Sequence, residues 1–81
     1  MWYYMTKYSF DPTKVTVGPF ESEEDAWADM EHSADEEYRI DTEENSWRTR
    51  IIKDKECGEI TIKNFFMDNT DVTEFFLFEI Q

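Results

Sequence analysis

The sequence predicts an α+β fold in which one α-helix packs on one face of a single antiparallel β-sheet, in the order ββαβββ. Two observations predict this fold. Residues 2–20 and 47–80 are rich in aromatic and β-branched residues interrupted by turn residues, as strands and hairpins are. Between them, apolar residues recur at helical spacing. A chain of 81 residues has room for one core, so we expect residues 1–81 to form a single domain.

The first two strands are expected to form a hairpin. Residues 2–10 form the first strand, and residues 11–14 form the turn, because Pro12 suits the second position of a type I turn. Residues 14–17 then return antiparallel. This second strand is predicted to end at Gly18 and Pro19, because proline cannot donate a hydrogen bond to the ladder.

The helix has a well-defined predicted start. Ser22 suits the N-cap, and three acids follow it in the first turn, where the helix macrodipole favours negative charge. On a helical projection, one apolar stripe contains Ala26, Trp27, Met30, Ala34 and Tyr38. Glu37 and Asp41 interrupt this stripe, so we expect the helix to end between residues 39 and 44.

Three strands are expected after the helix. Residues 47–53 and 59–66 form a second hairpin across a turn at residues 54–58, in which Gly58 can adopt positive φ. Residues 68–71 form another turn, and residues 72–80 form the last strand.

Negative charge is concentrated in the predicted helix. The chain has a net charge of −12, and residues 21–44 contain twelve acids and a single base, Arg39. At about 1.5 Å rise per residue, one net negative charge falls about every 3.3 Å along the helix. Phosphates on one strand of B-DNA are about 3.4 Å apart. The residues expected to bind a partner are Glu23, Glu24, Asp25, Asp29, Glu31, Asp35 and Glu36.

In size and charge distribution, the chain resembles the phage and mobile-element proteins that mimic DNA. The resemblance implies a small acidic protein-interaction module that inhibits a nucleic-acid-binding protein, in the anti-restriction or anti-CRISPR class. Such a protein occupies a basic groove and competes there with nucleic acid, and it does not itself bind nucleic acid. The plainer alternative is a charged helix face that serves solvation alone.

A second surface is expected on the sheet. Residues 2–10 and 72–80 are apolar on both sides, and one helix covers only one of them. The residues that we assign to the helix side are Trp2, Tyr4, Tyr8, Phe10, Phe76, Phe78 and Ile80. We assign Tyr3, Met5, Phe75 and Leu77 to the uncovered side. The alternative function is therefore a structural or regulatory protein that acts through this aromatic face, as a homodimer or as a partner-binding surface.

No pattern indicates catalysis, so we expect no enzymatic activity, no cofactor and no metal site. His32 is the sole histidine, and acids one turn away give only a weak metal-binding pattern. Cys57 is the sole cysteine, which excludes an intramolecular disulfide, and we expect it to be an inert turn thiol. The chain has no apolar run of about 20 residues and no signal-peptide pattern at its start, so we expect a cytoplasmic protein without membrane contact.

Overall fold

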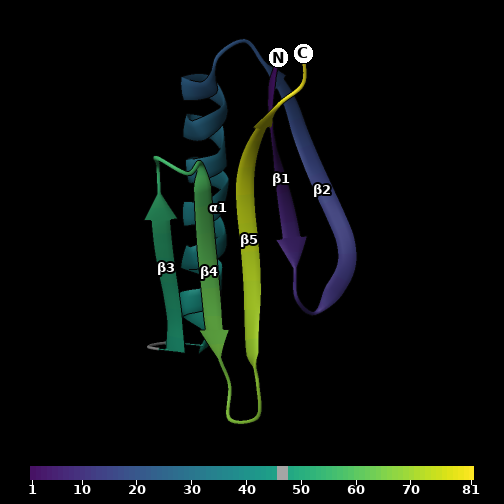
Figure 1. The fold of residues 1–81 in the computed structure, drawn as a ribbon. Helices are drawn as coiled ribbons and strands as arrows, with labels where there is room; N and C mark the ends of the chain where they lie inside the picture. Colours follow the sequence, from purple (N-terminus) through teal and green to yellow (C-terminus); the bar gives the residue numbers. More distant parts are fainter. Residues whose placement is uncertain (46–47) are drawn as a thin grey trace.

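Five strands form one antiparallel sheet, and one helix lies against one of its faces (Figure 1). The computed structural model describes residues 1–45 and 48–81. The elements are β1 (Trp2–Tyr8), β2 (Asp11–Phe20), α1 (Glu23–Asn45), β3 (Thr49–Asp54), β4 (Glu59–Phe65) and β5 (Thr70–Glu79). Their order is ββαβββ, which confirms the predicted α+β fold.

The strands are arranged as β2-β1-β5-β4-β3 across the sheet, so the first and last strands of the chain are central neighbours. The two termini consequently lie side by side (Figure 1). The Met1 amino group donates a hydrogen bond to Ile80 O at 2.9 Å. The edges of the sheet are β2 and β3.

The first hairpin turns at Ser9 and Phe10, not at residues 11–14 as predicted. β2 begins at Asp11, whose Oδ1 accepts a hydrogen bond from Thr13 N at 2.8 Å. β2 also continues as far as Phe20, so the predicted end at residue 17 is wrong. The reason is that β2 is an edge strand, where proline is tolerated because one side of the strand has no ladder partner.

The helix begins as predicted and ends later than predicted. Ser22 Oγ accepts a hydrogen bond from Asp25 N at 3.1 Å, which confirms the N-cap. The helix then runs to Asn45, beyond the expected end between residues 39 and 44. Glu37 and Asp41 interrupt the apolar stripe, but they do not end the helix, because the sheet beneath this part of α1 is also polar.

The second hairpin and the last strand differ from prediction by one or two residues. Gly58 has φ +70° in the turn between β3 and β4, which confirms its predicted conformation. β4 ends at Phe65 and β5 begins at Thr70. The predicted start of the third strand at Trp47 lies outside the described residues.

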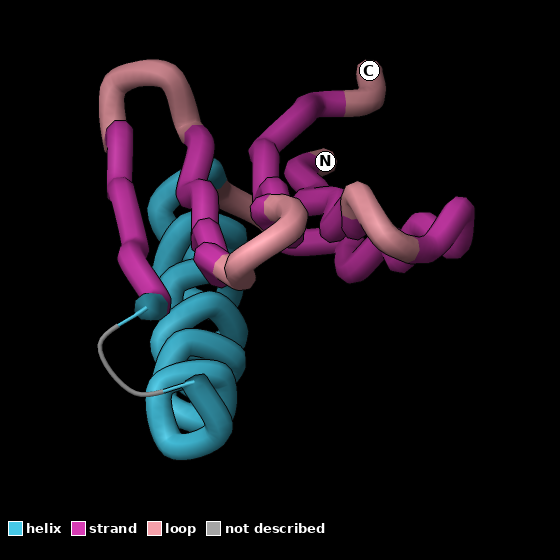
Figure 2. Tube along the Cα trace, turned by 90° about the horizontal axis from the view of Figure 1, so that it is seen from below, coloured by secondary structure: helices cyan, strands magenta, loops and turns pink. Residues whose placement is uncertain are grey.

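The core lies between α1 and the sheet (Figure 2). The buried apolar residues are Tyr4, Ala26, Trp27, Met30, Ala34, Ile60, Ile62 and Phe75. The predicted helix stripe is confirmed, with Tyr38 partly buried at its lower end. Each large aliphatic side chain buried here stabilises the fold by about 1.5–3 kcal/mol relative to full exposure.

β5 turns its side chains the opposite way from the predicted assignment. Its pairing with β1 aligns Phe75 with Thr6, and Leu77 with Tyr4, and both β1 residues are buried under the helix. Phe75 is only 4% exposed. The prediction that Phe75 and Leu77 lie on the uncovered face is therefore wrong: both face α1.

Gly18 permits a close approach between β2 and the Tyr3 ring. Its φ is +144°, and a Cβ atom at this position would lie 2.5 Å from Tyr3 Cδ2. The register of β1 and β2 shifts here, and the Gly18–Pro19 peptide bond is cis.

We therefore expect Gly18→Ala to lower the free energy of unfolding by about 1–3 kcal/mol, because alanine disfavours this φ and its methyl group meets the ring. Urea denaturation measures the change. In a Tyr3→Ala background the same substitution should cost less, since the ring is gone. Equal costs in the two backgrounds would show that the ring is not the obstacle.

Candidate interaction surfaces

Nine carboxylates of α1 are exposed or partly exposed along the helix, and we call them the acidic face. They are the seven predicted partner-binding residues, Glu23, Glu24, Asp25, Asp29, Glu31, Asp35 and Glu36, together with Glu43 and Glu44. At 100° per residue most of them fall into two rows along the helix rather than one stripe. The row nearer β3 contains Glu24, Glu31 and Asp35. The row nearer β1 contains Asp25, Asp29, Glu36 and Glu43.

A lysine from the sheet neutralises part of the row nearer β3. Lys53 Nζ lies 2.8 Å from Asp35 Oδ1 and 3.1 Å from Glu31 Oε2. The hydrogen bond to Asp35 is the main reason that the pKa of Lys53 is raised. Exposed pairs of this kind contribute at most about 1 kcal/mol. Their larger effect is to fix two carboxylates in place and to reduce the charge of the row.

Arg39 makes a similar bridge within the other row. Its Nη2 lies 2.6 Å from Glu36 Oε1, and its Nη1 lies 2.8 Å from Glu43 Oε1. The hydrogen bond from Arg39 lowers the pKa of Glu36. With Lys53 and Arg39 counted, the nine carboxylates leave one net charge about every 5 Å along the helix. This spacing is looser than the predicted value of about 3.3 Å, because a sheet lysine joins the face, two helix acids turn inward and Glu21 precedes the helix.

The row nearer β1 is tied to the core by a tyrosine. The Tyr4 hydroxyl donates to Asp29 Oδ2 at 2.7 Å and lies 3.0 Å from Ser33 Oγ. Tyr4 is 3% exposed, and burial raises the pKa of its hydroxyl. Asp29 is therefore held in position from beneath.

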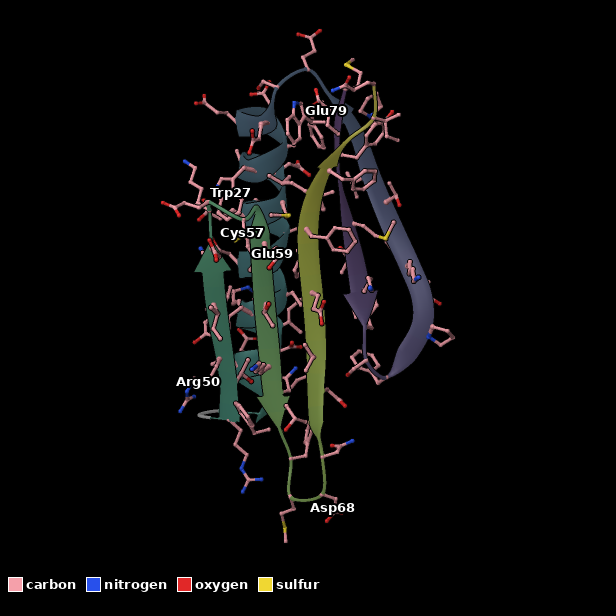
Figure 3. All side chains as sticks on the ribbon, viewed as in Figure 1. Trp27, Arg50, Cys57, Glu59, Asp68 and Glu79 are labelled. Carbon is pink, nitrogen blue, oxygen red and sulfur yellow. The ribbon has the colours of Figure 1, made fainter. Side chains whose placement is uncertain are left out.

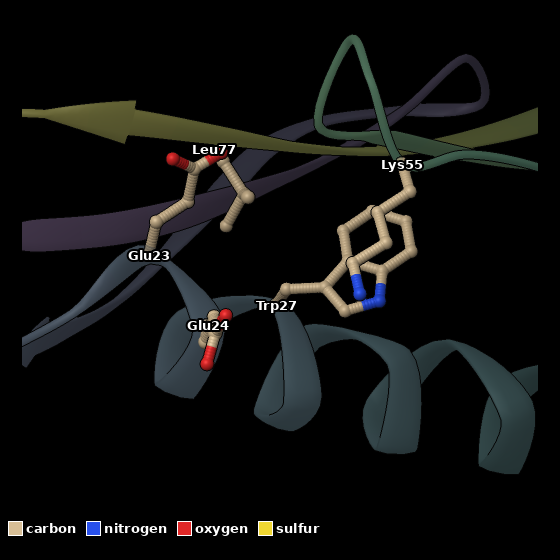
Figure 4. Close-up of a pocket in the computed structure, with 5 residues that line it drawn as sticks. All are labelled: Glu23, Glu24, Trp27, Lys55 and Leu77. Carbon is tan, nitrogen blue, oxygen red and sulfur yellow. The ribbon is translucent and has the colours of Figure 1, made fainter.

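A cleft of about 210 Å³ opens where the start of α1 faces the turn between β3 and β4 (Figure 4). It is lined by Glu23, Glu24, Trp27, Lys55 and Leu77. Only 7% of Trp27 is exposed, and its indole N–H has no hydrogen-bond partner among the described residues. Solvent still reaches this N–H. The cleft therefore joins two members of the acidic face to an aromatic wall.

Two acids of α1 face the sheet instead of solvent. Asn64 Nδ2 donates to Asp41 Oδ2 at 2.9 Å, and Thr49 Oγ1 donates to Asn64 Oδ1 at 2.7 Å. Glu37 lies one turn earlier on the same side and has no hydrogen bond or ion pair among the described residues. Its partial burial raises its pKa, and the charges of Asp41 and Glu44 raise it further.

Aromatic residues line the face of the sheet that α1 leaves uncovered. This open sheet face contains the predicted Tyr3 and Met5, and their partners on β5 are Phe78 and Phe76. The Tyr3 and Phe78 rings stack with centroids 5.6 Å apart, and the Phe76 ring follows at 6.3 Å from Phe78. Lys7 Nζ lies 5.7 Å from the centroid of Phe76. We call the rings of Tyr3, Phe78 and Phe76 the aromatic ladder. Within the described part of the chain, no element covers it.

The remaining candidate residues are exposed. Cys57 lies in the turn between β3 and β4 (Figure 3), and its interaction with Asp54 raises the pKa of the thiol. His32 is exposed on α1. Across residues 1–45 and 48–81, no three His, Cys, Asp or Glu side chains come together as metal ligands. No helix in these ranges is both long enough and apolar enough to cross a membrane.

No family model matches this chain, and no curated protein or solved structure is significantly similar to it. Its candidate function therefore depends on the acidic face, the cleft and the open sheet face.

Some residues of these surfaces were not predicted from the sequence. Lys53 follows Ile51 at the spacing that puts both on one side of a strand, so its position facing α1 had a sequence signal. The cleft had none, because it depends on how the turn containing Lys55 folds over Trp27. The sequence predicted Trp27 only as a core residue.

Glu37 gives a pH-dependent test of the polar half of the interface between α1 and the sheet. Because its pKa is raised in the fold, the folded state binds more protons than the unfolded state, and stability falls as pH rises above the ordinary glutamate value of 4.5. We expect Glu37→Gln to raise the free energy of unfolding at pH 7 by a few tenths of a kcal/mol, since it also removes a like-charge pair with Asp41. At pH 3 the gain should vanish.

Denaturant unfolding at both pH values measures this difference. Glu24→Gln is the matched control, because it removes the same charge from the outward side of the helix. Destabilisation by Glu37→Gln at pH 7, or an equal effect of the two substitutions at both pH values, would contradict the expectation.

Proposed function

We propose that this protein is an acidic interaction module that binds a basic, nucleic-acid-handling protein through the acidic face, as DNA mimics do. The proposal depends on the concentration of charge in one element. The helix holds eleven carboxylates and one base. Solubility requires net charge, but it does not require that charge to gather on one element.

The arrangement of the carboxylates supports this proposal. Their two rows lie roughly 115° apart around a helix that is about 10–12 Å across with its side chains, so the distance between the rows is somewhat less than this diameter. The phosphate rows that border the major groove of B-DNA are separated by about 12 Å. A basic site shaped for a duplex could therefore contact both rows at once.

Rigidity supports the proposal as well. The helix is anchored by Trp27 and Met30, and Tyr4 holds Asp29 from beneath. Carboxylates that are already ordered lose little conformational entropy on binding. Their combined field would also attract a basic partner over long distances at low salt. By occupying the basic groove in which the partner binds nucleic acid, the protein would inhibit that partner, in the manner of anti-restriction or anti-CRISPR proteins.

Salt dependence and competition with DNA test this function. Immobilised protein should retain a nucleic-acid-handling protein from the source cell at low salt. About 0.5 M NaCl should release it, because the screening length then falls to a few Å. Duplex DNA added at low salt should also release it. Retention that persists in about 0.5 M NaCl, or that DNA does not reverse, contradicts the proposal.

Two charge-matched variants sharpen this test. The triple substitution of Glu24→Gln, Asp25→Asn and Asp35→Asn removes three charges from the acidic face, and it should reduce retention about tenfold or more. The control removes three exposed charges elsewhere, through Glu56→Gln, Asp68→Asn and Glu79→Gln, and it should have little effect. Equal losses would assign binding to net charge alone.

The aromatic ladder favours a second candidate function, in which the open sheet face forms a homodimer or binds another protein. Tyr3, Phe78 and Phe76 form a continuous apolar strip, and Met5 lies beside it. Apolar patches of this kind mark interaction sites when polar residues surround them. In this case the acidic face would serve solubility.

Sedimentation velocity tests the homodimer. At high protein concentration the wild-type chain should sediment as a dimer, and Tyr3→Glu should make it monomeric by placing a charge in the ladder. Val15→Glu is the control, because Val15 is exposed on the other side of neighbouring β2. A monomeric wild-type protein contradicts the homodimer.

A further inference from the structure

The cleft at the start of α1 combines negative charge with apolar surface. Glu23 and Glu24 come from the first turn of the helix, and Trp27 follows one turn later. Leu77 contributes an aliphatic surface from β5 (Figure 4). Such a lining suits a group that has an apolar stem and a positively charged end.

Lys55 already brings one positive charge to the cleft. It belongs to the turn between β3 and β4, and its side chain extends toward Trp27 (Figure 4). Lys55 is exposed and forms no ion pair with another residue in the described ranges. Its ammonium group can therefore be displaced by the cationic group of a binding partner without breaking a salt bridge.

Trp27 adds a second requirement. Its indole N–H is a donor without an acceptor among the described residues, although the side chain is 7% exposed. This N–H is still reached by solvent, so an incoming carbonyl oxygen would replace water as its acceptor. The Trp ring is also the aromatic surface that attracts cations most strongly.

We propose that this cleft receives one arginine or lysine side chain of a protein partner. The charged end lies at the carboxylates of Glu23 and Glu24, and the stem lies on the Trp27 ring. A main-chain carbonyl of the partner accepts the indole N–H. The volume of about 210 Å³ is below the range of about 300–1,000 Å³ typical of small-molecule sites, so one side chain fits better than a whole ligand.

This inference rests on the proposed function, because it gives the basic partner an anchor on the acidic face. Interfaces commonly depend on a few side chains that enter well-packed pockets, while the surrounding contacts contribute little. The outer carboxylates would guide the partner, and the cleft would fix its register.

Binding of a short peptide to ¹⁵N-labelled protein tests the cleft. The probe is acetyl-Arg-Arg-Arg-amide at low salt, and its control replaces each arginine with citrulline, which has nearly the same shape without the charge. We expect the indole N–H resonance of Trp27 to shift saturably with the arginine peptide. The citrulline peptide should not shift it, and the indole resonance of Trp2 should move less.

Three variants are expected to change the affinity for the arginine peptide in different ways. Glu24→Gln should weaken peptide binding about threefold or more, because it removes a carboxylate from the cleft. Glu44→Gln removes a charge of the acidic face at the far end of α1 and should weaken binding clearly less than Glu24→Gln does. Lys55→Ala should strengthen binding about threefold, because it removes the competing cation. None of the three side chains is buried, so the fold should tolerate each change.

The outcomes separate this inference from the proposed function. A shift of the Trp27 resonance with the three variant effects supports the cleft. Shifts spread along α1 without Trp27, and equal weakening by Glu24→Gln and Glu44→Gln, overturn the cleft and leave the acidic face as the binding surface. No resonance change at low salt overturns both.

Discussion

The whole structure depends on one constraint: a single helix supplies the entire second layer of a five-stranded sheet. Met30 and Ala34 are fully buried against the sheet, and Ile60 and Ile62 meet them from β4. This contact decides which side of every strand is core. It also forces most of the helix acids outward, and no other element among the described residues covers the opposite face of the sheet. Both candidate surfaces are therefore consequences of the same packing.

The contact between helix and sheet changes character along its length. Near the start of α1 it is apolar, with Trp27 and Met30 over the sheet. Toward the end, Asp41 accepts a hydrogen bond from Asn64, which in turn accepts one from Thr49, and Glu37 is half-buried with no such partner among the described residues. Hydrogen bonds contribute less net stability than the burial of large apolar side chains. The firmly packed half of the helix is therefore the half that carries the cleft.

The sequence predicted the element order, the N-cap at Ser22 and the apolar stripe, because each depends on neighbours along the chain. It did not predict which face of β5 meets the helix. Phe75 and Phe76 are equally apolar, so the alternation that normally identifies the core face was uninformative, and only the pairing with β1 decides the matter. Similarly, a proline such as Pro19 would end a central strand but is tolerated in an edge strand. The position of β2 at the edge is a property of the whole sheet.

The two bases that bridge carboxylates on the acidic face bear on the proposed function. Lys53 and Arg39 each bind two carboxylates, so each group of three side chains keeps a net charge of about −1 while its geometry is fixed. A helix selected for solvation gains nothing from ordered carboxylates, since water accommodates them in any orientation. Ordering does lower the entropy lost when a partner binds. The arrangement thus retains negative charge and reduces the entropy lost on binding, and both properties would favour the proposed binding of a basic protein.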